Sequence, residues 1–189
     1  MKALLAFAFL SVVSGCHVQT APDGALSVAG AGRVYKVGPH DYRGPQLTAE
    51  QFAVLRTFEP DRMWCDVKLN TAWPGDGGHD VLPSGMEEFD HPWQPFGGVS
   101  HADLRAAVDD AEACERSGLA TYRHCTHGED RTGLELGIER VDAHVPVCNA
   151  WREMIAFGFH DGTVNKPGLI LFVKAFERET GVDVDEACQ

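Results

Sequence analysis

Apolar residues in this chain follow two patterns: runs with helical spacing, and shorter runs typical of β-strands. Thr48 is placed to cap the first helical run, with Gln51 three residues later as a capping-box partner. Ser100 is placed to cap the second, which Gly118 ends. A short strand and turn are predicted over 35–44, and strands over 63–69, 86–93 and 119–124. Helices are predicted from 48 (apolar positions 52, 55 and 58), over 100–118, 134–143 and 146–157, and from 167. Because strands and helices alternate, we expect an α/β fold, with a mostly parallel central sheet flanked by helices.

The first residues have a different pattern. Lys2 precedes a short apolar run over 3–13, and Val13-Ser14-Gly15-Cys16 ends it with small residues before a cysteine. This opening resembles a bacterial lipoprotein signal, which implies cleavage before Cys16, lipidation of Cys16, and anchoring at the cell envelope, facing the periplasm or exterior. An ordinary secretory signal and a cytosolic chain with an apolar start are the alternatives. Residues 17–33, rich in Ala, Gly, Ser and Pro, then form a flexible tether, and 34–189 the folded domain.

Length and composition limit the function. A chain of 189 residues, 44% of them hydrophobic, is long enough for one domain with its own core. Its net charge of -12 argues against a nucleic acid partner. It also disfavours a heavily phosphorylated small ligand, because such ligands are usually surrounded by several Lys or Arg side chains.

Residues 124–133 carry the main chemical signal. Five residues separate Cys125 from Arg131, enough to form a loop whose N–H groups point inward at the start of a helix. Gly128 permits the tight turn that such a loop needs. This environment lowers the pKa of a thiol, and the guanidinium of Arg131 can hold two phosphate oxygens. The predicted phosphate-binding residues are those of the loop: Thr126, His127, Gly128, Glu129, Asp130 and Arg131.

This run resembles the active-site loop of the cysteine-based protein tyrosine and dual-specificity phosphatases, which has His-Cys, five residues, Arg, Ser or Thr, and Gly. Residues 42–48, Tyr-Arg-Gly-Pro-Gln-Leu-Thr, resemble a Tyr-Arg-Ser-Gly-Gln-Leu stretch in bacterial members. The resemblance implies a single phosphatase-like domain that needs no cofactor and no metal, acts as a monomer, and hydrolyses phosphoproteins or small phosphate esters through a phosphocysteine. It further implies that Cys125 is the nucleophile, Arg131 the transition-state clamp, Thr132 the group that steadies the leaving thiolate, and His124 a support behind the loop.

The general acid is less clear from the sequence. In the family it lies on a mobile loop before the cysteine, where Asp90 has a suitable spacing. Asp103 is at a helix start, where it favours the helix dipole. Asp130 resembles the aspartate that myotubularin-like lipid phosphatases carry inside the loop. Asp90 is slightly favoured over Asp130. An alignment that puts Gln94 at the acid position instead predicts a pseudophosphatase that only binds phosphorylated ligands.

The remaining cysteines are Cys65, Cys114, Cys148 and Cys188, which form two disulfides in one of three pairings or stay free. None has a second ligand at the spacing of a zinc site. Asp76, His79 and Asp80 are interpreted as polar residues of a solvated turn rather than as a metal site. The strand before Cys125 contains Arg123, so either one face of that strand is less buried or Arg123 pairs with an acid.

Overall fold

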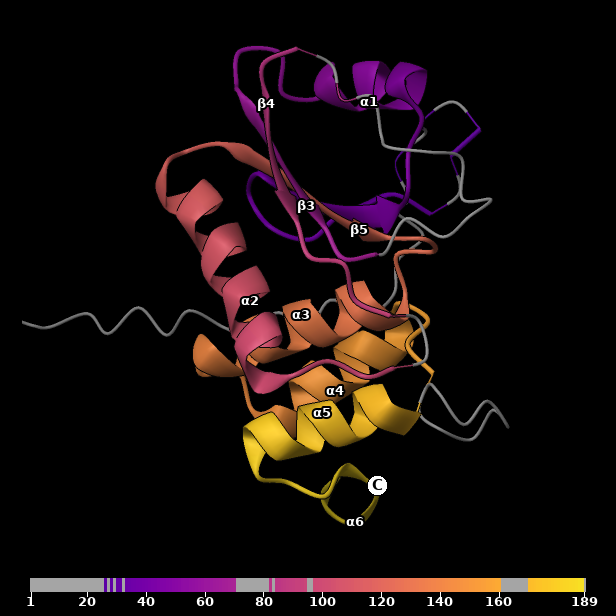
Figure 1. Ribbon diagram of the computed structural model, residues 1–189, viewed down its shortest axis with the longest axis vertical. Helices are drawn as coiled ribbons and strands as arrows, with labels where there is room; N and C mark the ends of the chain where they lie inside the picture. The colour runs from indigo at the N-terminus through magenta and orange to yellow at the C-terminus, as the bar shows by residue number, and fades with distance from the viewer. Residues whose placement is uncertain are drawn as a thin grey trace, which may run out of the picture.

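A five-stranded sheet, in the order β1-β2-β5-β3-β4, organises the computed structural model (Figure 1). The strands are β1 (Tyr35–Lys36), β2 (Asp41–Pro45), β3 (Trp64–Lys68), β4 (Met86–Asp90) and β5 (Ala120–Cys125). Strands β2, β5, β3 and β4 are parallel, and β1 pairs antiparallel with β2 at the edge. The structure describes residues 26, 28, 30–31, 33–70, 82, 84–94, 97–160 and 170–188. The predicted α/β class, with a mostly parallel sheet flanked by helices, is confirmed.

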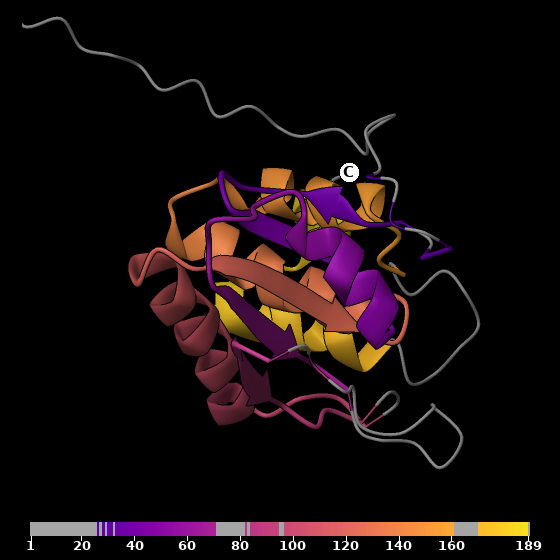
Figure 2. The same ribbon diagram turned by 90° about the horizontal axis from the view of Figure 1, so that it is seen from above.

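Helices cover both faces of the sheet (Figures 1 and 2). They are α1 (Ala49–Arg56), α2 (His101–Arg116), α3 (Asp130–Asp142), α4 (Val147–Ala156), α5 (Ile170–Thr180) and α6 (Val184–Ala187). On one face, α1 packs through Phe52 and Leu55 against Trp64 and Tyr122 of the sheet. On the other, α2, α3, α4 and α5 enclose a larger core. None of the described helices is long and apolar enough to cross a membrane.

The helix starts follow the predicted capping chemistry. Thr48 and Gln51 form the expected capping box at the start of α1. The Ser100 side chain accepts a hydrogen bond from the Asp103 N–H at the start of α2. Phe58, expected on the buried face of the first helix, is 41% exposed, because α1 ends at Arg56 and no longer directs Phe58 toward the core.

Two of the boundaries that differ from the prediction bear on the site and on the extent of the domain. Strand β4 ends at Asp90 rather than Trp93, because pairing with β3 stops at Lys68 opposite Asp90. Leu26 and Val28, assigned to the tether, pack in the core below α1, and Leu26 pairs with Val34. The folded part therefore extends N-terminal to residue 34. The predicted signal over 1–16, Cys16 included, and the predicted turn residues at 76, 79 and 80 lie outside the described residues.

Four cysteines form two disulfides. Cys65 on β3 is bonded to Cys114 on α2, which joins the sheet to a covering helix. Cys148 on α4 is bonded to Cys188, which follows α6 near the C-terminal end. This is one of the three pairings that the sequence left open, and Cys125 is the free cysteine of the described residues.

Strand β5 is buried along its whole length and includes a charged residue, Arg123. Its guanidinium is paired with four carboxylates from β2, α2 and α3: Asp41, Glu115, Glu135 and Glu139. The second of the two interpretations of Arg123, pairing with an acid, is therefore correct. Burial raises the pKa of Asp41 to about 7 and that of Glu135 to about 8, although Arg123 opposes both shifts.

Candidate active site

Cys125 is the last residue of β5, with β2 on one side and β3 on the other. Helix α3 begins five residues later at Asp130, and Arg131 is its second residue. Residues 126–129 therefore form a short loop between the carboxyl end of a central strand and the N-terminus of a helix. This is the edge of an α/β sheet where ligands usually bind, and the helix dipole favours an anion there.

Gly128 fixes the shape of this loop. Its φ is 74°, in the left-handed region that a side chain disfavours. A Cβ atom at this position would lie 2.3 Å from the carbonyl carbon and oxygen of Gly44. Gly44 has no room for a side chain either, because its Cβ would lie 2.5 Å from the Tyr122 hydroxyl. The loop thus rests directly on strand β2.

The Cys125 thiol is buried, with 3% of the residue exposed. Burial alone would raise the pKa of this thiol, but the charge of Arg131, the hydroxyl and N–H of Thr132 and the N–H of His127 outweigh it and lower the pKa. The Thr132 hydroxyl is buried with no hydrogen-bond partner assigned in the described part of the chain, and it is one of the groups that lower the pKa of Cys125. The site therefore favours a thiolate, the nucleophilic form of cysteine.

Arg131 is buried beside the thiol, with only 7% of the residue exposed. Its Nη1 donates to the Trp93 carbonyl oxygen at 3.1 Å, and its Nη2 donates to the Thr126 hydroxyl at 2.9 Å. The guanidinium carries five N–H donors, and among the described residues these two contacts use only two of them. The contact with Trp93 brings the segment after β4 to the loop.

His124 lies behind the loop on β5 and is fully buried. Its Nε2 is 3.2 Å from a carboxylate oxygen of Asp66 on β3, and its ring stacks on that of Tyr122 at 5.4 Å between centroids. These contacts fix the ring orientation. The sequence pattern indicated His124 but not Asp66, because nothing in the chain order shows that these two residues lie on neighbouring strands.

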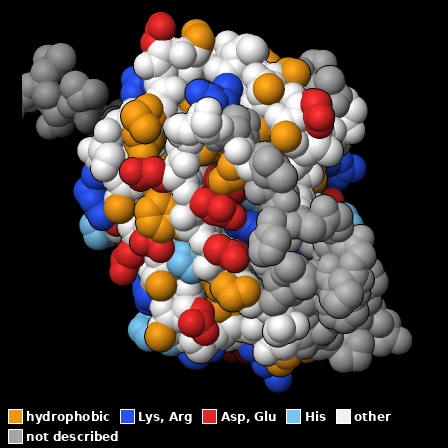
Figure 3. Space-filling model, turned by 45° about the horizontal axis from the view of Figure 1, so that its top comes forward, with side chains coloured by type: hydrophobic (Ala, Val, Ile, Leu, Met, Phe, Trp, Pro, Cys, Tyr) orange, Lys and Arg blue, Asp and Glu red, His pale blue; other side chains and the backbone are white. Residues whose placement is uncertain are grey.

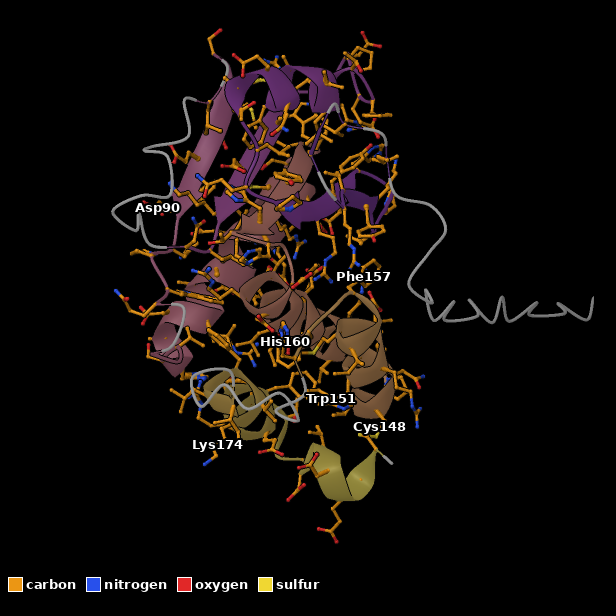
Figure 4. All side chains as sticks on the ribbon, turned by 90° about the vertical axis from the view of Figure 1, so that its right-hand side faces the viewer. Asp90, Cys148, Trp151, Phe157, His160 and Lys174 are labelled. Carbon is orange, nitrogen blue, oxygen red and sulfur yellow. A yellow bond between two sulfur atoms is a disulfide. The ribbon has the colours of Figure 1, made fainter. Side chains whose placement is uncertain are left out.

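Asp90, the favoured acid, lies at the outer edge of the sheet (Figure 4). It is in register with Lys68, which is in register with His124, so the Asp90 side chain is on the same sheet face as His124. Cys125, the next residue, points to the opposite face. No described contact joins Asp90 to the loop, whereas Trp93, next to Gln94, contacts Arg131.

Asp130 has a partner that the sequence did not indicate. Its Oδ1 accepts a hydrogen bond from the His160 N–H at 2.9 Å, and Nδ1 of the His160 ring is 2.9 Å from the same oxygen. Both side chains are partly exposed, and Figure 4 shows His160 beside α3. The pair is thus a carboxylate and an imidazole adjacent to Arg131, in reach of solvent.

The other loop side chains point outward. His127 is exposed, and Glu129 is partly exposed and lies 3.8 Å from the guanidinium of Arg33. Within the described residues, no group of three or more His, Cys, Asp or Glu side chains is arranged to hold a metal ion.

Comparison with known proteins gives matches of structure. No protein-family model matches the chain, and no curated protein matches it in a sequence search. P. aeruginosa TpbA in complex with pTyr has a TM-score of 0.58 and 20% identity, over 82% of this chain and 87% of that one. The core catalytic domain of the PP-IP phosphatase SIW14 from S. cerevisiae has a TM-score of 0.59 and 15% identity, over 82% and 96%. Human DUSP28 has a TM-score of 0.54 and 14% identity, over 84% and 99%.

These similarities extend over most of the chain and over nearly the whole of each solved domain. This chain is built on the five-stranded sheet and the strand–loop–helix unit that holds Cys125 and Arg131. The chain therefore has the fold of the cysteine-based tyrosine and dual-specificity phosphatase superfamily.

Proposed function

We propose that this protein is a phosphatase that hydrolyses phosphate monoesters through a phosphocysteine at Cys125. The observation that supports it most is the combination at one loop of a buried thiol of lowered pKa, a guanidinium beside it and a helix N-terminus. Each part favours negative charge, and together they suit a phosphoryl group under attack by a thiolate.

In the first step of the proposed reaction, the Cys125 thiolate attacks phosphorus, the sulfur–phosphorus bond forms, and the bond to the ester oxygen breaks. The free N–H groups of Arg131 hold two non-bridging oxygens in the plane where charge spreads. In the second step, water attacks the phosphocysteine, releasing inorganic phosphate. The Thr132 hydroxyl stabilises the thiolate as it leaves.

The leaving oxygen of the first step needs a proton, and we assign its donor to Asp130, held by His160, with Asp90 as the alternative. Asp130 is next to Arg131 and partly exposed. Asp90 is on the sheet face away from Cys125. Because a general acid must reach the atom that it protonates, the place of Asp130 beside Arg131 favours it over Asp90.

Asp130→Asn should slow hydrolysis of an alkyl phosphate about 100-fold, the usual scale of general acid catalysis, and spare an aryl phosphate with a good leaving group. His160→Asn should act in the same direction but less strongly, because it removes the imidazole contact to Asp130 and leaves only the hydrogen bond from the backbone N–H of residue 160. Asp90→Asn is the control and should leave both rates near those of the wild type. A protonated acid makes kcat/KM fall at alkaline pH, where the acid loses its proton. If Asp90→Asn slows the alkyl phosphate and abolishes this alkaline fall, and Asp130→Asn does neither, the acid is Asp90 and not Asp130.

Gln94 supports a second candidate function, that of a pseudophosphatase. This exposed amide directly follows Trp93, whose carbonyl oxygen accepts a hydrogen bond from Arg131, whereas Asp90 is three residues before Trp93. An amide cannot donate a proton to a leaving alkoxide. A wild-type protein that binds phosphate esters but turns over neither aryl nor alkyl phosphates would favour this function.

The proposed substrates are phosphotyrosine-like esters, on proteins or small molecules. TpbA, a structure similar to this chain, is solved with pTyr. In the described part of the face shown in Figure 3, Lys and Arg side chains are scattered among acidic and apolar ones. The whole chain has a net charge of -12, and we therefore expect it to bind a phosphate monoester better than a polyphosphate.

The proposed location is the cell envelope, through lipid on Cys16. The short apolar run before Cys16 supports export, and two disulfides are expected of an oxidising compartment. Cys16→Ala should move the protein from the membrane fraction to the soluble one and leave its kcat/KM unchanged, as fractionation and an aryl phosphate assay would measure. A variant that still sediments with membranes would refute the lipid anchor.

A further inference from the structure

The reaction proposed above leaves one stretch without a role: residues 42–45 of β2, which resemble part of a stretch in bacterial phosphatases. This strand runs parallel to β5, with Gly44 opposite His124 and Pro45 opposite Cys125. Its central residue, Arg43, is 2% exposed. A buried guanidinium is costly unless its donors are paired, so its partners indicate its purpose.

The partners of Arg43 are backbone carbonyls of the active-site loop. Its Nη2 donates to the Gly128 carbonyl oxygen at 2.7 Å and, at 3.4 Å, to that of Glu129. The guanidinium lies 4.5 Å from the centre of the Phe157 ring, and Figure 4 shows Phe157 at the end of α4 that faces the sheet. Arg43 therefore joins strand β2 to the backbone of the loop and to the end of a helix.

These contacts determine where the loop N–H groups point. In a trans peptide, the carbonyl and the N–H of the same unit point in opposite directions. The Gly128 carbonyl shares its unit with the Glu129 N–H, and the Glu129 carbonyl shares its unit with the Asp130 N–H. When Arg43 draws the Gly128 carbonyl toward β2, the Glu129 N–H turns to the other side, where an anion would bind. The Glu129 carbonyl also accepts the first helical hydrogen bond of α3, from the Gly133 N–H at 2.8 Å, so Arg43 adds a second, longer contact to a carbonyl that the helix already holds.

We propose that Arg43 is a positioning residue of the phosphate loop, which holds the Gly128 carbonyl so that the Glu129 N–H faces the bound anion. The role rests on the proposed function, since it matters only if the loop binds an oxyanion. Arg43 does not touch the reacting atoms in this scheme. It acts through the loop backbone, from the strand on which Gly44 meets Gly128.

The charge of Arg43 adds a second effect. Burial lowers its pKa to about 10, and the negative charge of Cys125 is the largest of the influences that oppose this. Arg43 is therefore still a cation at neutral pH. Because coupling between two charges is reciprocal, the same interaction favours the Cys125 thiolate.

The test compares two variants. Arg43→Gln removes both the positive charge and the forked set of guanidinium N–H donors, whereas Arg43→Lys keeps the charge alone. Arg140→Gln is the matched control, because Arg140 also donates through Nη2 to a backbone carbonyl, that of Val37, at 2.8 Å. Two properties are measured: the thiol pKa of Cys125, from the pH dependence of alkylation by iodoacetamide, and the affinity for orthovanadate, by calorimetry. Thermal unfolding reports whether each variant is folded.

Arg43→Gln should raise the thiol pKa and weaken vanadate binding by about tenfold or more. Arg43→Lys should keep the thiol pKa near that of the wild type but weaken vanadate binding, because one ammonium cannot reproduce the fork. Arg140→Gln should change neither. A folded Arg43→Gln with wild-type values for both properties would overturn the proposal. If Arg43→Gln does not fold, wild-type vanadate affinity in Arg43→Lys would overturn it.

Neither measurement depends on turnover, so this role and the proposed function can fail separately. A protein that hydrolyses no phosphate ester, but whose thiol pKa and vanadate affinity respond to Arg43 as expected, would retain the positioning role and lose the phosphatase assignment. A protein that hydrolyses phosphate esters, but whose thiol pKa and vanadate affinity do not respond to Arg43, would retain the phosphatase assignment and lose the positioning role.

Discussion

Cys125→Ser should abolish turnover of every phosphate ester while the loop still binds an oxyanion. The thiol is the nucleophile of the first step of the proposed reaction, and a serine hydroxyl stays protonated in a site that stabilises a thiolate. Removal of a nucleophile commonly costs about 10⁴-fold or more in kcat. The loop N–H groups and Arg131 do not depend on sulfur, so binding should persist.

The measurement pairs an aryl phosphate assay with calorimetric titration of inorganic phosphate into both proteins. A rate within about tenfold of the wild type would contradict a covalent mechanism at Cys125. Loss of phosphate binding together with turnover would indicate that the variant loop is misfolded. Thermal unfolding of the two proteins separates that outcome from a chemical effect.

Arg123→Leu should strongly destabilise the folded protein. It removes the guanidinium from four carboxylates, of which Asp41 and Glu135 are fully buried, and leaves Arg140 as a cation that still acts on Asp41. Removing one partner of a buried charge pair costs about 3–5 kcal/mol of folding free energy, because the other charges stay buried and unpaired. Urea denaturation at neutral pH would measure the loss.

The control is Arg116→Leu. Arg116 also pairs with a glutamate, Glu112, but its side chain is 65% exposed. A surface pair of this kind contributes about 1 kcal/mol or less. If the two leucine variants lose similar stability, the carboxylates around Arg123 do not depend on it.

The same cluster predicts how stability responds to pH. The pKa of Asp41 is raised from 3.8 to about 7, and that of Glu135 from 4.5 to about 8, so the folded protein binds more protons than the unfolded chain between these limits. The contribution of these two groups to stability is therefore greatest below about pH 4 and is lost as the pH rises to about 8. Arg123→Leu should regain stability on acidification, since its carboxylates then become neutral.

The sequence predicted those parts of the site that depend on neighbouring residues. The spacing from His124 to Gly133, the caps at Thr48 and Ser100, and the alternation of strands and helices are all local patterns, and the structure has the expected elements at these places. The anion site could be predicted for the same reason, because the strand, the loop and the helix start that form it are contiguous in the chain. For this reason the loop was recognisable without any tertiary information.

The features that the sequence did not reveal join distant residues. His160, which lies four residues after the end of α4, contacts Asp130, and Arg43 contacts Gly128 across 85 positions. The pairing of Cys65 with Cys114 depends on how α2 packs on β3, which no spacing rule gives. The end of β4 depends on where β3 stops pairing, so the position of Asp90 relative to Cys125 was not evident either.

The most direct test of the proposed mechanism is to stop the reaction with an aryl phosphate within one turnover and identify the modified peptide by mass spectrometry. We expect one phosphoryl group on the peptide that contains Cys125, formed in a burst that precedes steady release of phosphate and absent from Cys125→Ser. Continued hydrolysis by the wild-type protein with no phosphoryl group on Cys125 at any time within the turnover would contradict the phosphocysteine mechanism.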